Sequence, residues 1–336
     1  MKITPNASLL SYNTFGIDVN ASFLVEYTSV IDLQTVLLSE IVKSQPLLIM
    51  GGGSNLLFLK DFNGVILHSE IKSIEKLRED ADSIYLEVGS GVAWDDLVAY
   101  AVQNGWGGAE NLSLIPGEAG ASAVQNIGAY GVEVQDIIEE VNVVEIETAK
   151  LKTFTKEECR YGYRESIFKN ELKGRYIITS VIFRLAKQPV FKLIYQHLEE
   201  EVLKNGAINL QNIRKTIISI RESKLPDPKV VGNAGSFFMN PVISKNHFRT
   251  LHKRYPLMPH YFVSETQEKV PAGWLIEQCG WKGKQIGNAG AHDKQALVLV
   301  NLGGATGLEI LHLAEQIQSS VKETFGIELK PEVNYI

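Results

Sequence analysis

The alternation of apolar and polar residues predicts helices and strands that follow one another along the whole chain. Residues 29–43 carry apolar side chains three and four positions apart, the spacing of an amphipathic helix. The same spacing predicts helices at residues 94–104, 208–223, 272–279 and 307–325. Short apolar or alternating runs predict strands at residues 21–27, 46–50, 65–68, 84–88, 141–147, 176–185 and 296–301. The chain is therefore expected to mix helices and strands, with an α/β arrangement in its last third.

Two glycine-rich runs interrupt this pattern and contain few bulky side chains. The first, GGGSN at residues 51–55, follows a predicted strand; the second covers residues 112–131, where Glu118 is the only charged residue. Backbone without branched side chains can lie close to a ligand and point its N–H groups at an anion. Together the runs predict a large phosphate-bearing cofactor, although tight turns with close packing would explain either run alone. Neither run matches a Walker loop or the G-x-G-x-x-G fingerprint.

Length and composition limit the remaining classes of protein. A chain of 336 residues is long for one core, and prolines 226 and 228 support a boundary near residue 225. The formal net charge of −6 argues against a nucleic-acid-binding protein. The two cysteines lack metal-binding spacing, which favours a reducing compartment without a disulfide framework. No window approaches the roughly 18 apolar residues of a membrane span, so a cytoplasmic protein without a membrane or nucleic-acid partner is expected.

Three polar residues stand out as candidates for chemistry. Arg164 directly follows Tyr163 in YGYRESIFK, Ser236 lies in GNAGSFFMNP, and Glu332 lies in a proline-containing C-terminal tail. Each also has an ordinary explanation: a solvated arginine, a turn-capping serine and an exposed carboxylate. Ser236 could alternatively be the nucleophile of a hydrolase or transferase, with His292 and Asp293 as its partners, although no GxSxG elbow is present. The glycine-rich runs alone would also suit a nucleotide-binding regulatory module.

Six motifs, in this order along the chain, resemble those of the UDP-N-acetylenolpyruvoylglucosamine reductase family. They are GGGSNLLF, NLSLIPGEAGASAVQNIGAYG, YGYRESIFK, KLPDPKVVGNAGSFFMNP, AGWLIEQCGWKGKQIG and LKPEVNYI. The resemblance implies an α+β fold, with a two-lobed FAD-binding domain of the vanillyl-alcohol oxidase/PCMH type and a C-terminal α/β substrate-binding domain. The implied boundaries are residues 1–68, 69–224 and 225–336, with the C-terminal tail returning to the active site. A segment near residues 190–201, with Tyr195, is similar to the extra tyrosine loop that one form of the family carries.

The resemblance also implies a reaction. The family reduces UDP-N-acetylglucosamine enolpyruvate to UDP-N-acetylmuramate in peptidoglycan synthesis, passing a hydride from NADPH to FAD and then to the vinyl carbon. Arg164 would stabilise the charge on the substrate carboxylate, because a guanidinium offers a fixed fork of donors. Ser236 would protonate the enolate, and Glu332 would be protonated or would orient a neighbouring donor. FAD would bind non-covalently, since neither glycine-rich run contains His or Cys.

The remaining site residues carried over from the resemblance form two groups. The residues expected to bind FAD are Gly51, Gly52, Gly53, Ser54, Asn55, Ile115, Pro116, Gly117, Ala121, Ser122, Asn126, Gly128, Ala129, Tyr130 and Gly131. The residues expected to bind the UDP-sugar are Tyr163, Tyr195, Lys224, Asn240, Tyr261, Lys282 and Gln295. No metal site is expected.

Overall fold

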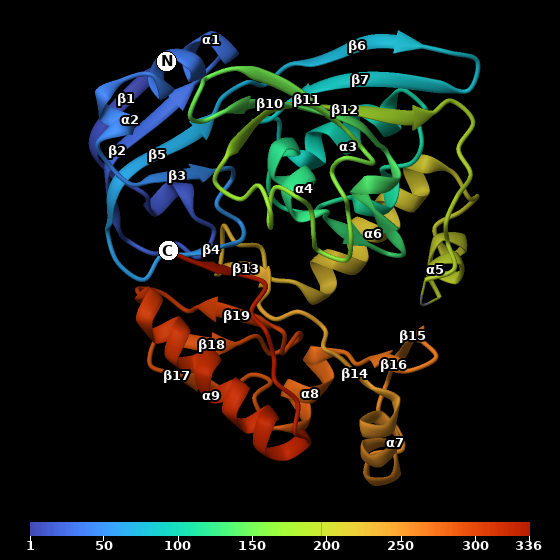
Figure 1. The fold of residues 1–336 in the computed structure, drawn as a ribbon. Helices are drawn as coiled ribbons and strands as arrows, with labels where there is room; N and C mark the ends of the chain where they lie inside the picture. Colours follow the sequence, from blue (N-terminus) through green and yellow to red (C-terminus); the bar gives the residue numbers. More distant parts are fainter. Residues whose placement is uncertain (196) are drawn as a thin grey trace. The chain divides into compact units, whose positions relative to one another are not determined.

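The computed structural model describes residues 1–195 and 197–336, which divide into two compact units (Figure 1). Unit 1 comprises Met1–Ala7, Ala21–Gly52 and Asn63–Arg221. Unit 2 comprises Ser8–Asn20, Gly53–Phe62 and Glu222–Ile336. The C-terminal third thus shares its unit with two short N-terminal segments, while the domain boundaries expected from the sequence stay a prediction. Both units contain helices and strands, in agreement with the expected α+β class.

The first part of unit 1 is a four-stranded sheet in the order β1-β2-β5-β3. Its strands are β1 (Lys2–Ser8), β2 (Asn20–Tyr27), β3 (Leu47–Met50) and β5 (Phe62–Ser69), with β3 and β5 parallel. The helix expected at residues 29–43 is broken into α1 (Val30–Leu37) and α2 (Glu40–Lys43). The break falls at Ser39, whose backbone is extended and whose hydroxyl donates to the carbonyl of Val36 at 2.6 Å. A serine that bonds back to the preceding turn competes with the helix, which explains the interruption.

The second part of unit 1 is an antiparallel sheet of five strands in the order β11-β10-β12-β7-β6. The strands are β6 (Ile74–Glu79), β7 (Ser83–Gly89), β10 (Ile138–Glu145), β11 (Leu151–Thr155) and β12 (Tyr176–Ala186). Helix α3 (Trp94–Gln103) lies on one side of this sheet (Figure 1), where Trp94 packs edge-on against Phe183. Helices α5 (Leu198–Lys204) and α6 (Leu210–Lys224) complete the segment. The predicted strands and helices of this region are confirmed.

The second glycine-rich run contains a helix that the sequence pattern did not predict. It folds as α4 (Ala119–Gln125) followed by the short strands β8 (Gly128–Ala129) and β9 (Val132–Glu133). The small residues Ala119, Gly120 and Ala123 are buried. A Cβ on Gly120 would lie 2.7 Å from the Cβ of Ser90, so only glycine permits this approach. The helix ends at Asn126, which adopts a left-handed conformation with φ of 48°.

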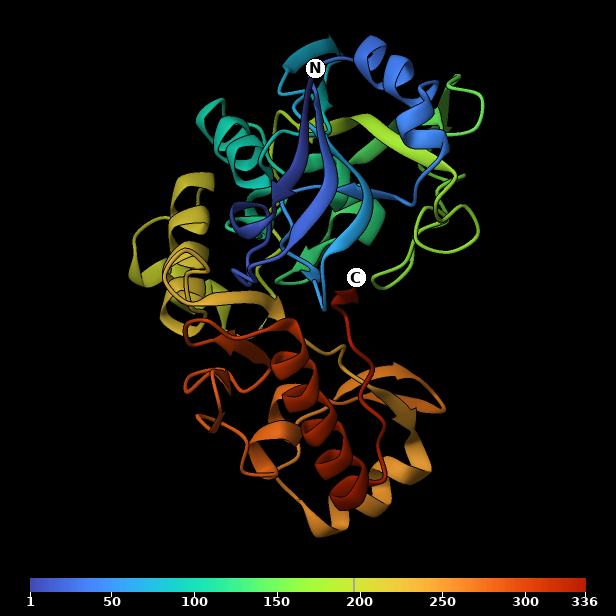
Figure 2. The same ribbon diagram turned by 90° about the vertical axis from the view of Figure 1, so that its left-hand side faces the viewer.

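Unit 2 is built around a four-stranded sheet in the order β13-β19-β18-β17. Its strands are β13 (Gly232–Ser236), β17 (Gln285–Ile286), β18 (Ala289–Ala291) and β19 (Val298–Asn301). Helices α8 (Ala272–Gln278) and α9 (Gly307–Phe325) belong to the same unit, and α9 begins with a capping box formed by Thr306 and Glu309. Figure 2 shows the C-terminal tail running back along α9, where Gln318 donates to the carbonyl of Leu329 at 2.8 Å.

The rest of unit 2 consists of small elements. A three-stranded sheet combines β14 (Val242–Ser244), β16 (Gln267–Lys269) and β15 (Tyr261–Ser264), with α7 (Lys245–Arg254) between β14 and β15. The tail strand β20 (Asn334–Tyr335) pairs in parallel with β4 (Leu56–Leu57). Across residues 1–195 and 197–336, no helix combines the length and apolar content needed to cross a lipid bilayer.

Candidate active site

The two glycine-rich runs meet inside unit 1. A Cβ on Gly52 would lie 3.5 Å from the Cα of Gly117, and one on Gly51 would lie 3.4 Å from the Cβ of Ala121. Within the described chain, the amides of Gly51 and Gly52 donate no hydrogen bond. Free amides on a glycine backbone can bind an anion, so this part of the loop fits the diphosphate of FAD.

The other residues of the GGGSN run belong to unit 2. A Cβ on Gly53 would come within 2.0 Å of the carbonyl oxygen of Tyr12, and its φ is +61°, so tight packing alone demands glycine there. Gly53 is buried, whereas Ser54 and Asn55 are partly exposed. Their contacts with a cofactor stay a prediction.

Most polar groups of the second run are engaged within unit 1. The amides of Ala119 and Gly120 donate to the carbonyls of Val92 and Ser90 at 2.9 and 3.0 Å. The Ser122 hydroxyl donates to the carbonyl of Ala119 at 2.7 Å. Several other positions of the run are accessible. The exposed positions are Pro116, Ala121 and Gly131, and the partly exposed ones are Ile115, Gly117, Gly128, Ala129 and Tyr130.

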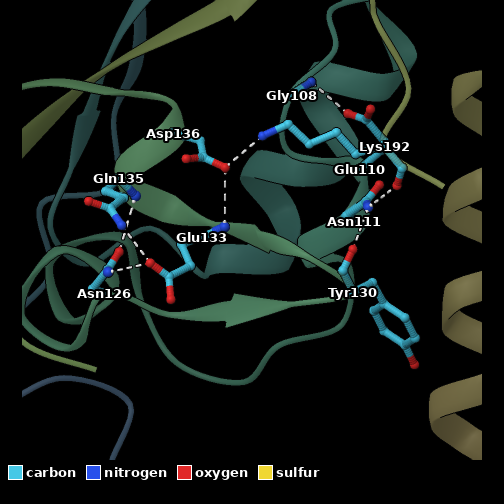
Figure 3. A network of polar contacts seen from close by, with 9 residues as sticks. All are labelled: Gly108, Glu110, Asn111, Asn126, Tyr130, Glu133, Gln135, Asp136 and Lys192. Atoms are coloured by element: carbon cyan, nitrogen blue, oxygen red, sulfur yellow. Dashed lines mark hydrogen bonds and ion pairs between the residues drawn. The ribbon is translucent and has the colours of Figure 1, made fainter. Parts of the chain in front are cut away.

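Asn126 is fully buried and holds three segments together. Its side-chain amide donates to the carboxylate of Glu133 at 2.9 Å, and its side-chain oxygen accepts from the backbone amide of Gln135 at 3.2 Å (Figure 3). The side-chain amide also donates to the carbonyl of Gly162 at 2.7 Å. The buried side chain of Asn126 therefore fixes the backbone at the end of α4 in the second glycine-rich run.

A polar network connects the second run to the predicted tyrosine segment (Figure 3). Asn111, which is 1% exposed, donates to the carbonyls of Tyr130 at 3.0 Å and Lys192 at 2.8 Å. The Lys192 ammonium pairs with Asp136 at 2.9 Å. The rings of Tyr130 and Tyr195 meet edge-to-face with their centroids 5.8 Å apart. The sequence analysis did not identify Asn111. The feature that could have indicated it is its position as a polar residue directly before a run of small and apolar residues.

Arg164 extends its guanidinium onto the second run. Its Nη2 donates to the carbonyl of Gly128 at 2.7 Å and its Nη1 to that of Asn126 at 3.2 Å. A Cβ on Gly128 would lie 2.9 Å from Nη1, so glycine makes room for the cation. Arg164 has a left-handed φ of 59°, a costly conformation for a residue with a side chain, and such strain is concentrated at functional sites. Tyr163 is exposed beside it, with the guanidinium 5.3 Å from the ring centroid.

Ser236 is exposed at the end of β13 in unit 2. The preceding Gly235 has φ of +66°, and its amide donates to the side-chain oxygen of buried Asn233 at 2.9 Å. The Thr14 hydroxyl in turn donates to the Asn233 carbonyl at 2.6 Å. The sequence analysis assigned no role to Thr14 or Asn233. Both residues shape the loop that presents the Ser236 hydroxyl.

The structure brings the backbones of Glu332 and Ser236 together. The Glu332 amide donates to the carbonyl of Phe237, the residue after Ser236, at 2.9 Å. The Asn55 side chain donates to the Glu332 carbonyl at 3.2 Å, and the Asn334 amide donates to the Asn55 carbonyl at 3.0 Å. Asn55, which is expected to bind the cofactor, therefore also holds the C-terminal tail by hydrogen bonds.

The residues expected to bind the UDP-sugar differ in accessibility. Asn240 accepts a hydrogen bond from the Ala272 amide at 2.9 Å at the start of α8, and Gln295 is partly buried. Lys224, the last residue of α6, and Lys282, which pairs with Glu277 at 2.9 Å, are exposed cations. Tyr261 opens β15. These residues belong to unit 2, whereas Arg164, Tyr163 and Tyr195 belong to unit 1.

The arrangement does not support Ser236 as a hydrolase nucleophile. The Nε2 of His292 lies 3.3 Å from Asp293, and its Nδ1 accepts from the Lys294 amide at 3.3 Å. No hydrogen bond joins His292 to Ser236 anywhere in the described part of the chain. Without a base in contact, a serine hydroxyl is a weak nucleophile.

Comparison with known proteins agrees with the geometry. Residues 227–336 match the family model "UDP-N-acetylenolpyruvoylglucosamine reductase, C-terminal domain", and residues 21–155 match the model "FAD binding domain". Among solved structures, UDP-N-acetylenolpyruvylglucosamine reductase from Thermus caldophilus has a TM-score of 0.69 at 23% identity, covering 99% of this chain and 98% of that chain. 6-Hydroxy-D-nicotine oxidase from Arthrobacter nicotinovorans has a TM-score of 0.57 at 14% identity, covering 99% and 88%. The expected FAD-binding fold with a separate C-terminal domain is thereby confirmed.

The curated relatives extend over the whole length. UDP-N-acetylenolpyruvoylglucosamine reductase of Bacteroides fragilis is 53% identical over 329 residues, covering 98% of this chain and 98% of its own. The enzyme of the same name from Flavobacterium johnsoniae is 49% identical over 339 residues, covering 100% of each. Identity at this level along the entire sequence shows that the chain belongs to the UDP-N-acetylenolpyruvoylglucosamine reductase family.

Proposed function

We propose that the protein is an NADPH-dependent flavoenzyme that reduces UDP-N-acetylglucosamine enolpyruvate to UDP-N-acetylmuramate for peptidoglycan synthesis in the cytoplasm. The full-length relatives carry the name of this reductase, and an FAD-binding domain covers residues 21–155. One structural observation carries the proposal: the guanidinium of Arg164 is fixed on the Asn126 and Gly128 carbonyls of the second glycine-rich run. A cation held at the run expected to contact the flavin suits a reaction that builds negative charge beside it.

In this proposal each of the three candidate residues has a role in the reaction. Bound FAD would supply the redox chemistry, carrying a hydride from NADPH to the vinyl CH2 carbon of the substrate. Negative charge then develops on the neighbouring carbon and its carboxylate, and Arg164 stabilises it with two parallel N–H donors. Ser236, exposed at the end of β13, gives its hydroxyl proton to that carbon. Glu332, whose amide is bonded next to Ser236, either is protonated or orients the neighbouring donor.

The remaining residues bind the nucleotide end in this proposal. Lys224 and Lys282 are exposed and can approach a diphosphate as point charges. Tyr195 closes over the diphosphate, while Tyr163, Asn240, Tyr261 and Gln295 contact the rest of the UDP-sugar. NADPH and the UDP-sugar use the same flavin face in turn, so ping-pong kinetics are expected.

The proposal is tested by replacing Ser236 with alanine and following the flavin absorbance in stopped flow. NADPH should bleach the flavin at nearly the parent rate, because hydride transfer from NADPH needs no proton from Ser236. Reoxidation by the enolpyruvate should slow by about 10⁴-fold or more, at or beyond the upper end of the usual range of general acid catalysis. Ser236→Cys should recover part of the loss, since a thiol keeps a transferable proton in that place. Reoxidation of Ser236→Ala at the parent rate would show that the proton comes from another group. A folded protein that binds no FAD would refute the proposed function itself.

A further inference from the structure

Glu118 lies at the N-terminus of α4 but does not cap it. No hydrogen bond joins its side chain to an amide of the helix. Its two carboxyl oxygens instead point at the first glycine-rich run, with Oε2 3.1 Å from the position of a Cβ on Gly51 and Oε1 3.8 Å from one on Gly52. The side chain is only 12% exposed. The carboxyl therefore lies against the backbone of Gly51 and Gly52, whose amides donate no hydrogen bond in the described chain.

Three neighbouring segments surround this carboxyl with ionisable groups. The groups that face it are Tyr27 of β2, His68 of β5, and Glu70 and Lys72 just after β5. Lys72 pairs with Glu70. Within residues 1–195 and 197–336, no lysine or arginine forms an ion pair with Glu118. A buried carboxylate without a cation in contact is costly.

His68 lies closer to Glu70 than to Glu118. Its Nδ1 lies 3.2 Å from the carbonyl of Met50, which can only accept, so Nδ1 carries a proton. Its Nε2 lies 3.2 Å from Glu70 but 3.9 Å from Glu118. Burial, and then the charge of Glu70, raise the pKa of Glu118 to about 8. Glu118 therefore keeps its proton at neutral pH.

We propose that FAD binds only to the form of the protein in which Glu118 is a neutral carboxylic acid. A carboxylate beside the Gly51 and Gly52 amides would repel the FAD diphosphate, whereas a carboxylic acid can donate a hydrogen bond toward it. This inference rests on the proposed use of FAD. It assigns to Glu118 the role of a positioning residue that makes FAD affinity depend on pH.

The test is the dissociation constant of FAD for the apoprotein, measured by flavin fluorescence between pH 6 and about 9.5. For the parent protein we expect binding to weaken by about tenfold or more across this range, as Glu118 ionises. Glu118→Gln keeps a donor of the same shape and cannot ionise, so its affinity should stay constant. Glu70→Gln removes the charge that helps to raise the pKa of Glu118, so this variant should keep the pH dependence but move its midpoint to lower pH.

A second measurement uses the parent protein, so it does not depend on the folding of a variant. Infrared spectra of the FAD-loaded parent protein at neutral pH should contain a carboxylic-acid carbonyl band that disappears as the pH rises through the range where FAD affinity falls. A parent affinity that does not change with pH, or a Glu118→Gln affinity that changes as much as the parent's, overturns the inference and leaves the proposed function standing. A folded protein that binds no FAD at any pH overturns both.

Discussion

At the residue scale, the proposed role of Arg164 rests on its strained backbone and on the position of its guanidinium. Its guanidinium spans two carbonyls, which an ammonium cannot reproduce with the same geometry. Arg164→Lys should therefore slow flavin reoxidation by the enolpyruvate by about 10²–10³-fold while NADPH still reduces the flavin normally. Stopped-flow absorbance measures both steps. Arg160→Lys is the matched control, because Arg160 is exposed and pairs only with Glu171 at 2.8 Å in the described chain; equal losses in the two variants would contradict the assignment.

Glu118 also makes a prediction about stability. Its pKa in the folded protein is about 8, far above that of an unfolded glutamate, so the folded state binds a proton that the unfolded state releases. The resulting cost is absent below about pH 4, grows as the pH rises toward 8 and is constant above it. Glu118→Gln should therefore raise the free energy of unfolding of the apoprotein by about 2 kcal/mol at pH 7, allowing for partial exposure, and by almost nothing near pH 4.

Urea unfolding at the two pH values measures this difference. Glu75→Gln, on the exposed part of β6, is the control and should change neither midpoint. If the stability of Glu118→Gln follows that of the parent at both pH values, the Glu118 carboxyl is ionised in the folded protein.

At the scale of elements, the C-terminal tail contributes a strand that is expected to stabilise unit 2. The Asn334 amide donates to Asn55, the Ile336 amide to Leu57, and the Leu59 amide to Ile336, at 3.0, 3.0 and 2.9 Å. Deleting residues 334–336 removes all three bonds, and at about 1 kcal/mol each should lower the free energy of unfolding by about 3 kcal/mol. It should also slow reoxidation by the substrate, since Glu332 is held by the same pairing. Thermal unfolding and stopped flow measure the two effects.

Ile336→Ala is the control for the deletion, because it keeps the backbone bonds. It should retain most of the stability and the parent reoxidation rate. A deletion variant as stable as Ile336→Ala would mean that the strand pairing of β20 with β4 contributes little.

At the scale of the whole molecule, unit 2 is discontinuous in sequence. Asn301 donates to the carbonyl of Phe15 at 2.9 Å, and a Cβ on Gly307 would lie 1.8 Å from the carbonyl oxygen of Phe58. Phe15 and Phe58 are fully buried. The fragment 222–336 alone should therefore lack part of its core and fail to unfold cooperatively, because losing a buried aromatic side chain costs about 3–5 kcal/mol. Near-ultraviolet circular dichroism and calorimetry test this expectation, with the full chain as control. A cooperative transition in the fragment would show that the N-terminal segments are dispensable.

The sequence by itself determined most of the secondary structure, the fold class and the family. The strands at residues 84–88 and 176–185 and the helix at 307–325 were predicted because apolar periodicity is a local signal. Helix α4 was missed because its small residues form no apolar stripe at helical spacing. Its small residues allow the helix to pack closely against Ser90. Helix α7 was missed because only Phe248 and Leu251 of its ten residues are buried.

Only the tertiary structure decided which groups meet at the candidate site. The order of the motifs indicated Arg164, Ser236 and Glu332, but not that Gly128 makes room for the guanidinium or that Asn55 holds the tail. Glu118 was visible in the sequence as the one charge in a run of small residues, yet its proton depends on burial and on Glu70, which lies 48 positions earlier in the chain. Hydrogen-bond partners and local dielectric come from segments distant in sequence, so they exist only once the chain has folded.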